Sequence, residues 1–383
     1  MKTESIDLFV FADALGWAQV KRRGFMVDLL PHRGPCDTIF GYSSTCDPSI
    51  LTGKMPAEHG HFSCFVYDPA HSPFRWTRWF GWLPEIVAGH HRVRNRVSRW
   101  CARRLGYTGY FQLYSVPFNR LPWLDYTEKR DLYAGGGILG GQEVIFDVWQ
   151  RSGRPWFRSD WRLDDEANVT ALKAQLAAGK IRLAYLFTAG LDATMHAHTT
   201  TGPAVDAAFA RFGRWLEEIH ALAAANYREV RLHVFSDHGM TDTRATSTMM
   251  HEFESLGLVY GRDYGAVWDS TMVRFWFLRE GVRVRVEQWL SDRNEGRILT
   301  AAQLAAWGCL FADRRYGELL YLLEPGTIFA PSFMNQRRVP AMHGFDPAHP
   351  DSAACWLTNY PSAVRPARIE RIFDVMAAAA GRG

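Results

Sequence analysis

The stretch IDLFVFADALGW, residues 6–17, begins with an apolar run and closes at Asp13 and Gly16. A short apolar run that ends at a turn signal is typical of a buried strand in a parallel sheet. Asp13 is therefore predicted to lie at the carboxyl end of a strand.

Two later stretches repeat this arrangement of an apolar run followed by acidic or imidazole side chains. IRLAYLFTAGLD ends at Asp192, and EVRLHVFSDHGM contains Asp237 and His238. The sequence between them, GPAVDAAFARFGRWLEEIHALAAA, has apolar positions at helical spacing. The order strand, helix, strand predicts an α/β fold with a mostly parallel central sheet covered by helices on both faces. In such sheets ligands bind at the carboxyl ends of the strands, where these side chains converge.

Composition bounds the class of protein. The chain has 383 residues, 47% of them hydrophobic and 22% charged, which is a globular composition. A net charge of +4 does not indicate specific nucleic-acid binding and is compatible with a small anionic substrate. The six cysteines form no CxxC pair, and MKTESIDLFVFAD lacks the features of a signal peptide. We therefore expect a reduced, cytoplasmic protein; the oligomeric state stays open.

Residues 76–164 have a different character. They contain WTRWFGWLPEIV, HHRVRNRVSRW and the glycine-rich YAGGGILGGQE, and long regular periodicity is absent. We expect an inserted cap for substrate recognition, with residues 1–75 and 165–383 forming the core. Its mixture of arginine and tryptophan could stack a nucleobase, bind a lipid-linked phosphate or rest on an anionic membrane surface. The simpler interpretation, which we favour, is that Trp76, Trp79 and Trp82 pack the cap onto the core.

Metal-competent side chains occur on four separate segments. Mixed carboxylate and imidazole ligation suits zinc or another first-row metal, with Mn²⁺ or Fe as alternatives at one site. Six such ligands suffice for two metals, which can clamp the attacking and leaving oxygens of a phosphoryl displacement. The six candidates are Asp13, Asp192, His196, Asp237, His238 and His343.

For some of these six candidates, a nearby residue is an alternative metal ligand or a structural role is an alternative explanation. Asp192 and His196 are four residues apart, so one helical turn would place them on the same side, but His198 is an alternative ligand. His59 and His61 could be structural. Any one strand-end aspartate is more often a turn or capping residue, so the joint pattern carries the prediction.

The stretch GYSSTCDPSILTGKMP, residues 41–56, offers four possible nucleophiles in succession. With the motifs PAEHG, LDATMHAHTTTGP, SDHGM and MHGFDP, it resembles the alkaline phosphatase superfamily, closest to its nucleotide pyrophosphatase/phosphodiesterase branch. The resemblance covers residues 5–75 and 180–350. CDPS is also similar to a sulfatase motif, but Ile50 stands where that motif has arginine.

The resemblance implies two zinc sites and a serine nucleophile. Asp192, His196 and His343 would hold one metal, and Asp13, Asp237 and His238 the other, together with the nucleophile's oxygen. The family's nucleophile precedes the Thr of a Thr-Gly pair by nine residues, which selects Ser43, with Ser44 as the fallback. The implied course is attack by Ser43 on phosphorus, a phospho-serine intermediate and its hydrolysis by a metal-activated water.

Substrate recognition is less defined. Phosphodiesterases of the family hold a phosphate oxygen with an asparagine, for which Asn95 and Asn119 are the candidates. The predicted function is hydrolysis of a phosphodiester or pyrophosphate bond in a nucleotide, nucleotide-sugar or lipid-linked phosphate. A phosphomonoesterase or phosphonate-processing hydrolase on the same core stays open, as does a catalytically silent binding or scaffold protein.

Overall fold

The computed structural model describes residues 3–82, 90–136, 138 and 141–381. Its largest sheet has the strand order β2-β16-β7-β1-β6-β5. Strand β16 runs antiparallel to its neighbours, whereas the other strand pairs are parallel. This confirms the mostly parallel α/β sheet. The strands are β1 (Thr3–Ala12), β2 (His32–Cys36), β5 (Trp156–Arg158), β6 (Leu183–Thr188), β7 (Tyr227–Phe235) and β16 (Ala354–Thr358).

Both faces of this sheet are buried, as the apolar run in β1 predicts. Leu8 and Val10 face one hydrophobic core, while Phe9 and Phe11 face another, because successive side chains of a strand point to opposite faces. The first core is covered by α1 (Trp17–Arg23), α7 (Asp165–Ala178) and α9 (Pro203–Asn226). The second is covered by α2 (Ser43–Thr52), α6 (Ile145–Ser152) and α13 (Ile372–Ala380).

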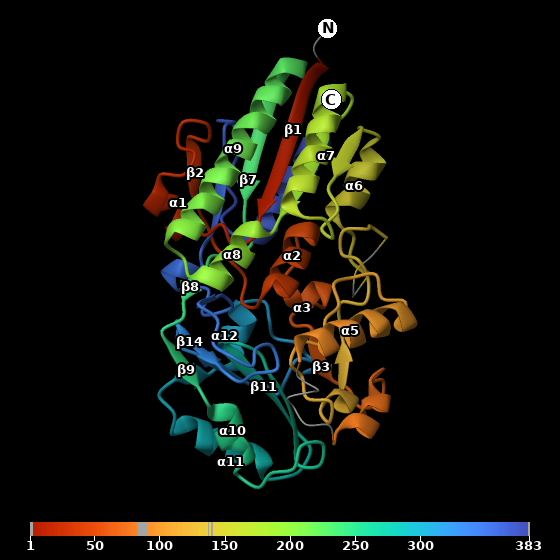
Figure 1. Ribbon diagram of the computed structural model, residues 1–383, viewed down its shortest axis with the longest axis vertical. Helices are drawn as coiled ribbons and strands as arrows, with labels where there is room; N and C mark the ends of the chain where they lie inside the picture. The colour runs from red at the N-terminus through yellow and green to blue at the C-terminus, as the bar shows by residue number, and fades with distance from the viewer. Residues whose placement is uncertain (1–2, 83–89, 137, 139–140, 382–383) are drawn as a thin grey trace.

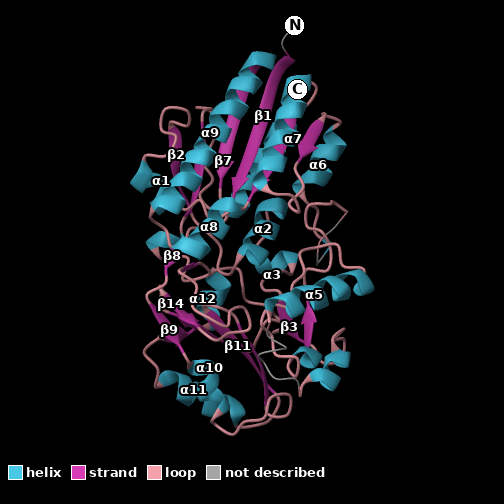
Figure 2. Cartoon of the chain, viewed as in Figure 1, coloured by secondary structure: helices cyan, strands magenta, loops and turns pink. Residues whose placement is uncertain are grey.

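A second sheet occupies the other half of the molecule (Figure 1). It is antiparallel, with the order β10-β11-β13-β12. Figure 2 shows that loops gather between the two halves, where β1 and β7 end. This half contains β10 (Tyr264–Trp268), β11 (Met272–Phe277), β12 (Gly296–Ile298), β13 (Leu319–Leu323), α10 (Met249–Glu254), α11 (Val282–Ser291) and α12 (Ala301–Ala306).

Most of the range predicted as a cap packs on this second sheet. Strands β3 (Phe65–Tyr67) and β4 (Leu124–Tyr126) pair with one another, and β3 lies against β10. The 3-10 helix η1 (Arg75–Phe80), helix α5 (His91–Leu105) and η2 (Leu121–Trp123) complete this region. Its apolar residues share one core with residues of β10, β11 and β13.

The carboxyl-terminal part of the predicted cap differs from the expectation. Strand β5 pairs in parallel with β6 and is the edge strand of the main sheet, and α6 packs against α13. The chain therefore returns to the main sheet before residue 165. The apolar spacing of IFDVWQ places Ile145, Phe146 and Trp149 in the core. The division into core and cap stays a prediction.

The remaining short elements lie outside the two larger sheets. They are α3 (Pro56–His59), α8 (Gly190–His198), β8 (Thr241–Asp242), β9 (Ala245–Ser247), β14 (Thr327–Phe329), β15 (Ala341–Met342), η4 (Pro350–Ser352) and η5 (Ile369–Arg371). No helix of the described residues has both the length and the apolar character needed to cross a lipid bilayer.

Candidate active site

Three parallel strands deliver acidic or imidazole side chains to one edge of the main sheet. In β1, Ala12 is in register with Thr188 of β6, and Phe11 is in register with Phe235 of β7. The strands therefore end side by side. Asp13 follows β1 directly, and its N–H donates to Thr188 O at 2.9 Å.

Helix α8 follows β6 and carries the first ligand set. Because Asp192 and His196 are one helical turn apart, His196 Nε2 lies 3.2 Å from Asp192 Oδ1. His343, directly after β15, places its Nε2 3.8 Å from the same oxygen. Ligand atoms of these three residues all lie within 4.8 Å of one another, a spacing that could hold one metal ion.

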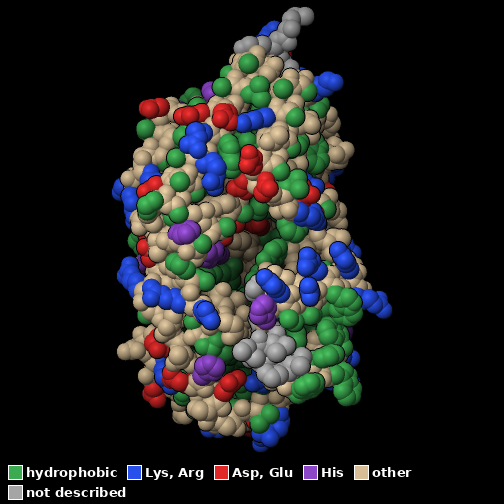
Figure 3. Space-filling model, in the orientation of Figure 1, with side chains coloured by type: hydrophobic (Ala, Val, Ile, Leu, Met, Phe, Trp, Pro, Cys, Tyr) green, Lys and Arg blue, Asp and Glu red, His purple; other side chains and the backbone are tan. Residues whose placement is uncertain are grey.

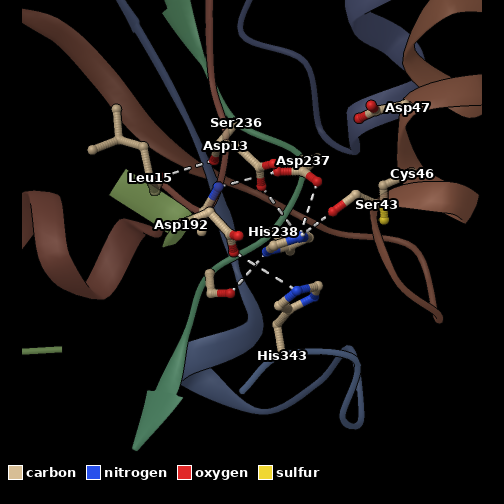
Figure 4. A network of polar contacts seen from close by, with 12 residues as sticks. Asp13, Leu15, Ser43, Cys46, Asp47, Asp192, Ser236, Asp237, His238 and His343 are labelled. Atoms are coloured by element: carbon tan, nitrogen blue, oxygen red, sulfur yellow. Dashed lines mark hydrogen bonds and ion pairs between the residues drawn. The ribbon is translucent and has the colours of Figure 1, made fainter. Parts of the chain in front are cut away.

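The loop after β7 carries the second set. His238 Nε2 lies 3.0 Å from Asp237 Oδ2 and 3.6 Å from Asp13 Oδ1. Ligand atoms of Asp13, Asp192 and His238 also lie within 4.8 Å of one another. Figure 4 shows Asp13, Asp237 and Asp192 gathered around His238, with His343 beside it.

Hydrogen bonds to the outer ring nitrogens fix the orientation of two histidines. His196 Nδ1 lies 2.8 Å from the carbonyl oxygen of Ala341, and His238 Nδ1 lies 2.9 Å from that of Gly239. A carbonyl can only accept, so each Nδ1 carries the proton and each Nε2 faces the cluster. Metal-ligating histidines are commonly held by such a bond.

The electrostatics of the cluster fit bound cations. Burial, reinforced by Asp237 and Asp192, raises the pKa of Asp13 well above its usual range. Burial lowers the pKa of His343, which stays neutral as a metal ligand must. Burial alone would lower the pKa of His238, but the Asp237 carboxylate raises it to about 9. Within the cluster, Asp192 Oδ1 and Asp237 Oδ2 lie close to histidine nitrogens but make no regular hydrogen bond with the described residues, and neither do the buried atoms Asp13 Oδ1 and His343 Nδ1.

Ser43 is the first residue of α2, as expected from its sequence. Its Oγ lies 3.1 Å from His238 Nε2. The first-turn N–H groups and the helix dipole favour negative charge at this position. Ser44 also lines the cavity, but its hydroxyl interacts with Cys64. The geometry therefore distinguishes the two serines, and the nucleophile's role stays a prediction.

The rival residues lie elsewhere. His198 is exposed on α8. His59 is buried, with its Nε2 2.8 Å from Ser49 Oγ, and its Nδ1 accepts from the N–H of His61. Cys46 is buried on the side of Ser43 remote from the cluster (Figure 4), and burial raises the pKa of its thiol. Each fits a structural role.

Gly239 adjoins a predicted ligand and has a packing requirement. A Cβ there would lie 2.0 Å from the carbonyl oxygen of Asp351, and Gly16 packs against its Cα. We expect Gly239→Ala to displace the His238 loop, costing about 2–4 kcal/mol of unfolding free energy and lowering the affinity for a divalent metal ion. Chemical denaturation and metal titration measure both effects. Gly381→Ala, with no atom closer than 3.7 Å, is the control. Wild-type stability and metal affinity in Gly239→Ala would contradict this expectation.

A cavity of about 660 Å³ opens beside Ser43 and contains residues that sequence reasoning missed. Asp47, one helical turn after Ser43, accepts a hydrogen bond from the Tyr133 hydroxyl at 2.9 Å. Its helical spacing from Ser43 could have identified it. Glu128, Tyr110, Tyr114 and Trp161 reach the cavity from the predicted cap, and no local pattern marks them.

The candidate asparagines are not part of this cavity. Neither Asn95 nor Asn119 is among its lining residues, whereas Asn335 is. Asn335 Nδ2 donates to Ser270 Oγ at 2.8 Å, which fixes its amide at the cavity wall. No local pattern in the sequence marks the loop that carries Asn335, and an asparagine contact to the substrate stays a prediction.

The α/β sheet, the strand-end ligand sets and the serine at a helix start define a phosphoester hydrolase of the alkaline phosphatase type. A family model described as type I phosphodiesterase / nucleotide pyrophosphatase matches residues 41–346, which is more than half of the chain. The chain belongs to this family, a branch of the alkaline phosphatase superfamily. The resemblance seen in the sequence is thereby confirmed.

Solved structures share the fold at low sequence identity. Human ectonucleotide pyrophosphatase / phosphodiesterase 5 aligns with a TM-score of 0.67 and 13% identity over 100% of this chain and 95% of that one. An inactive murine form of that protein, in complex with AMP, aligns with a TM-score of 0.66 and 14% identity over 99% of this chain and 95% of that one. Phosphonoacetate hydrolase from Sinorhizobium meliloti, in complex with phosphonoformate, aligns with a TM-score of 0.63 and 13% identity over 99% of this chain and 96% of that one. No curated protein matched the chain.

Proposed function

We propose that this protein is a two-zinc phosphohydrolase that cleaves a phosphodiester or pyrophosphate bond through a phospho-serine intermediate. The observation that carries the proposal is the position of Ser43 Oγ, 3.1 Å from His238 Nε2 and at the start of α2. A serine hydroxyl is a weak nucleophile unless its surroundings stabilise the alkoxide. Here a helix start and a metal-competent cluster meet at one oxygen.

The donor set supports two first-row cations. Asp192, His196 and His343 would hold one, and Asp13, Asp237 and His238, the last of which contacts Ser43, would hold the other. When bound, such cations lower the pKa of a coordinated hydroxyl and neutralise charge on phosphoryl oxygens. Zinc suits the mixed carboxylate and imidazole donors, and Mn²⁺ or Fe is the alternative at one site.

The residues of the chain supply nucleophile, charge and position. A bond forms from Ser43 Oγ to phosphorus as the bond from phosphorus to the leaving oxygen breaks. Water then cleaves the phospho-serine and regenerates the hydroxyl. Tyr42 orients this reaction by holding the start of α2, since its hydroxyl accepts from the Thr271 N–H at 2.9 Å.

The cavity supports a diester or anhydride over a monoester. Its volume of about 660 Å³ exceeds what a phosphoryl group alone requires, and Tyr110, Tyr114 and Trp161 provide apolar surface for a substituent. The likeness to a structure with bound AMP is consistent with a nucleotide substrate. The likeness to a phosphonoacetate hydrolase keeps phosphonate hydrolysis as the second candidate.

The experiment is metal analysis of the purified protein, followed by rates on bis-p-nitrophenyl phosphate, p-nitrophenyl phosphate and phosphonoacetate. We expect about two zinc ions per chain and the highest kcat/KM on the diester. Dominant monoesterase activity or dominant phosphonoacetate cleavage would reject the proposed substrate class. A chain that binds metal yet turns over none of the three would favour a silent binding protein.

Glu128 predicts a limit to activity at alkaline pH. Burial, reinforced by Asp47 and Asp131 and opposed by the Tyr110 N–H, raises its pKa to about 8. The carboxyl is therefore neutral at pH 7 and becomes an anion above about pH 8, where it repels an anionic substrate. We expect kcat/KM on bis-p-nitrophenyl phosphate to fall above pH 8, and Glu128→Gln to abolish that fall while keeping activity at pH 7 within about threefold.

The control for this profile is Glu58→Gln, because Glu58 is an exposed carboxylate on α3 outside the cavity lining. It should leave the profile as in the wild type. If Glu128→Gln retains the alkaline fall, the fall belongs to another group and Glu128 has no part in binding the anion.

A further inference from the structure

The predicted cap carries four exposed aromatic rings, and two of them, Trp79 and Trp82, were expected to pack the cap onto the core. Trp79 is 68% exposed, Phe80 43%, Trp82 76% and Trp100 53%. We call these four residues the aromatic patch. Large apolar side chains grouped at a surface mark an interaction site. The expectation that Trp79 and Trp82 pack the cap onto the core is therefore wrong, whereas Trp76 is partly buried.

The members of the patch form one surface. The ring of Trp76 contacts Phe80 at 5.9 Å and Trp100 at 5.2 Å between centroids, so it joins η1 to α5. The Trp82 indole N–H donates to the carbonyl oxygen of Trp79 at 2.9 Å. Figure 3 shows hydrophobic side chains gathered at the lower right of this face, with Lys and Arg side chains above them.

A strip of arginines borders the patch. Arg92, Arg96, Arg99 and Arg103 follow one another at intervals of four, three and four residues, so they lie along one side of α5. All four are exposed, and none has an ion-pair partner among the described residues. The opposite side of α5 is buried through Arg94, Ser98 and Cys101. We call these four arginines the basic strip.

The composition of the surrounding segment strengthens this asymmetry. Residues 69–124 contain nine arginines and a single acidic residue. Arg78 lies over the Trp79 ring, 5.0 Å from its centroid, so cationic and aromatic groups also meet inside the patch. The partner of such a surface must be both negatively charged and able to accept apolar rings.

A second copy of the chain does not meet this requirement. A two-fold symmetric dimer through the patch would set one basic strip against another, and like charges at short distance repel. A nucleic acid is negatively charged, but it accepts these aromatic rings less well than a lipid bilayer does. Bases stack on successive ring faces, whereas Phe80 and Trp100 meet Trp76 edge to face, at 76° and 78°.

We infer that the aromatic patch and the basic strip form a docking surface for an anionic lipid bilayer. Arginines would bind the headgroup phosphates and carboxylates, while the rings of Trp79 and Trp82 enter the boundary between headgroups and acyl chains. Tryptophan prefers this interfacial depth, and basic residues near an anionic surface each strengthen attraction. The surface is separate from the catalytic cluster, so docking does not depend on the proposed chemistry.

The experiment is co-sedimentation of the full chain with vesicles of phosphatidylcholine alone or with 30% phosphatidylserine. We expect binding to the anionic vesicles to be stronger by about 100-fold at ~0.1 M salt and to weaken as salt rises. The triple variant Arg96→Glu, Arg99→Glu, Arg103→Glu should lose about 100-fold in partitioning, and Trp79→Ser with Trp82→Ser about tenfold. Brominated acyl chains should quench wild-type tryptophan fluorescence more than that of the tryptophan variant.

Matched controls change exposed residues elsewhere. Arg214→Glu on α9 and Val364→Ser should bind vesicles as the wild type does, and all variants should keep their melting temperature and their rate on bis-p-nitrophenyl phosphate. Equal binding to both vesicle types, or unaltered binding by both variants, overturns the inference. Tighter binding of single-stranded DNA than of vesicles, or a dimer lost in the tryptophan variant, would overturn it in favour of that partner.

Discussion

Ser43→Ala is expected to lower kcat by at least about 1,000-fold, which corresponds to about 4 kcal/mol of transition-state stabilisation, on any substrate that the wild type cleaves. The change removes only the oxygen that lies 3.1 Å from His238 Nε2. Alanine also has a high helix propensity, so α2 should form as before. Stopped-time assays with bis-p-nitrophenyl phosphate measure the loss, and metal content should stay within error of the wild type.

Two neighbouring hydroxyl and thiol groups provide matched controls. Ser44→Ala and Cys46→Ala should each retain activity within about tenfold, because neither side chain contacts the cluster. If Ser44→Ala is the inactive variant, the nucleophile is one residue further along. If all three variants are active, water attacks the substrate directly and the phospho-serine course is wrong.

Five of the six candidate ligands could be placed from the sequence because each follows a strong local pattern. An apolar run marks a buried strand, and parallel strands bring their carboxyl ends to one edge, which places Asp13 and Asp237 together. One helical turn pairs Asp192 with His196. His343 has no such pattern of its own; it was a candidate because its imidazole can bind a metal, and the family resemblance assigned it to the site of Asp192 and His196.

The wall of the cavity could not be predicted in the same way. Glu128 belongs to YTEKRD, a charged stretch that is typical of a solvated surface, yet it is buried against the cavity. Its neighbours there come from segments distant in the sequence, and no periodicity relates them. Asn335 likewise reaches the wall from a loop. Substrate contacts depend on tertiary packing, which leaves no mark in a local pattern.

In the predicted cap, by contrast, side chains that were expected to be buried are exposed. Tryptophan is usually buried, so its density in residues 76–82 favoured an interior position. In the structure Trp76 satisfies that rule, while Trp79 and Trp82 are exposed on the short helix η1 and the turn after it. A short 3-10 helix gives no clear amphipathic pattern by which sequence alone could assign inner and outer faces.

A buried ion pair connects the second half of the molecule to the nucleophile. Arg274 of β11 is fully buried and donates to Asp269 Oδ2 at 2.9 Å and to Ser63 Oγ at 2.8 Å. Asp269 begins the turn that contains Thr271, whose N–H donates to the Tyr42 hydroxyl, and Tyr42 directly precedes Ser43. The pair therefore supports the backbone that positions the proposed nucleophile.

Arg274→Leu should lower the free energy of unfolding by about 3–5 kcal/mol, because it leaves the buried Asp269 carboxylate without its counter-charge. Urea denaturation measures the loss, and kcat should fall with it. The exposed pair of Arg283 and Glu287 is the control: Arg283→Leu should cost less than about 1 kcal/mol.

The pH dependence of the free energy of unfolding shows whether the buried charge of Asp269 causes the loss in Arg274→Leu. Burial raises the pKa of Asp269 and Arg274 lowers it, so loss of the arginine raises it further. When the pKa of a carboxyl is higher in the folded state than in the unfolded state, the free energy of unfolding of the protein falls as the pH rises from the unfolded-state pKa to the folded-state pKa. The deficit of Arg274→Leu relative to the wild type should therefore grow from pH 5 to pH 7, and adding Asp269→Asn should reduce it. A deficit that is constant with pH would point to lost packing around the arginine stem, with the buried charge contributing nothing.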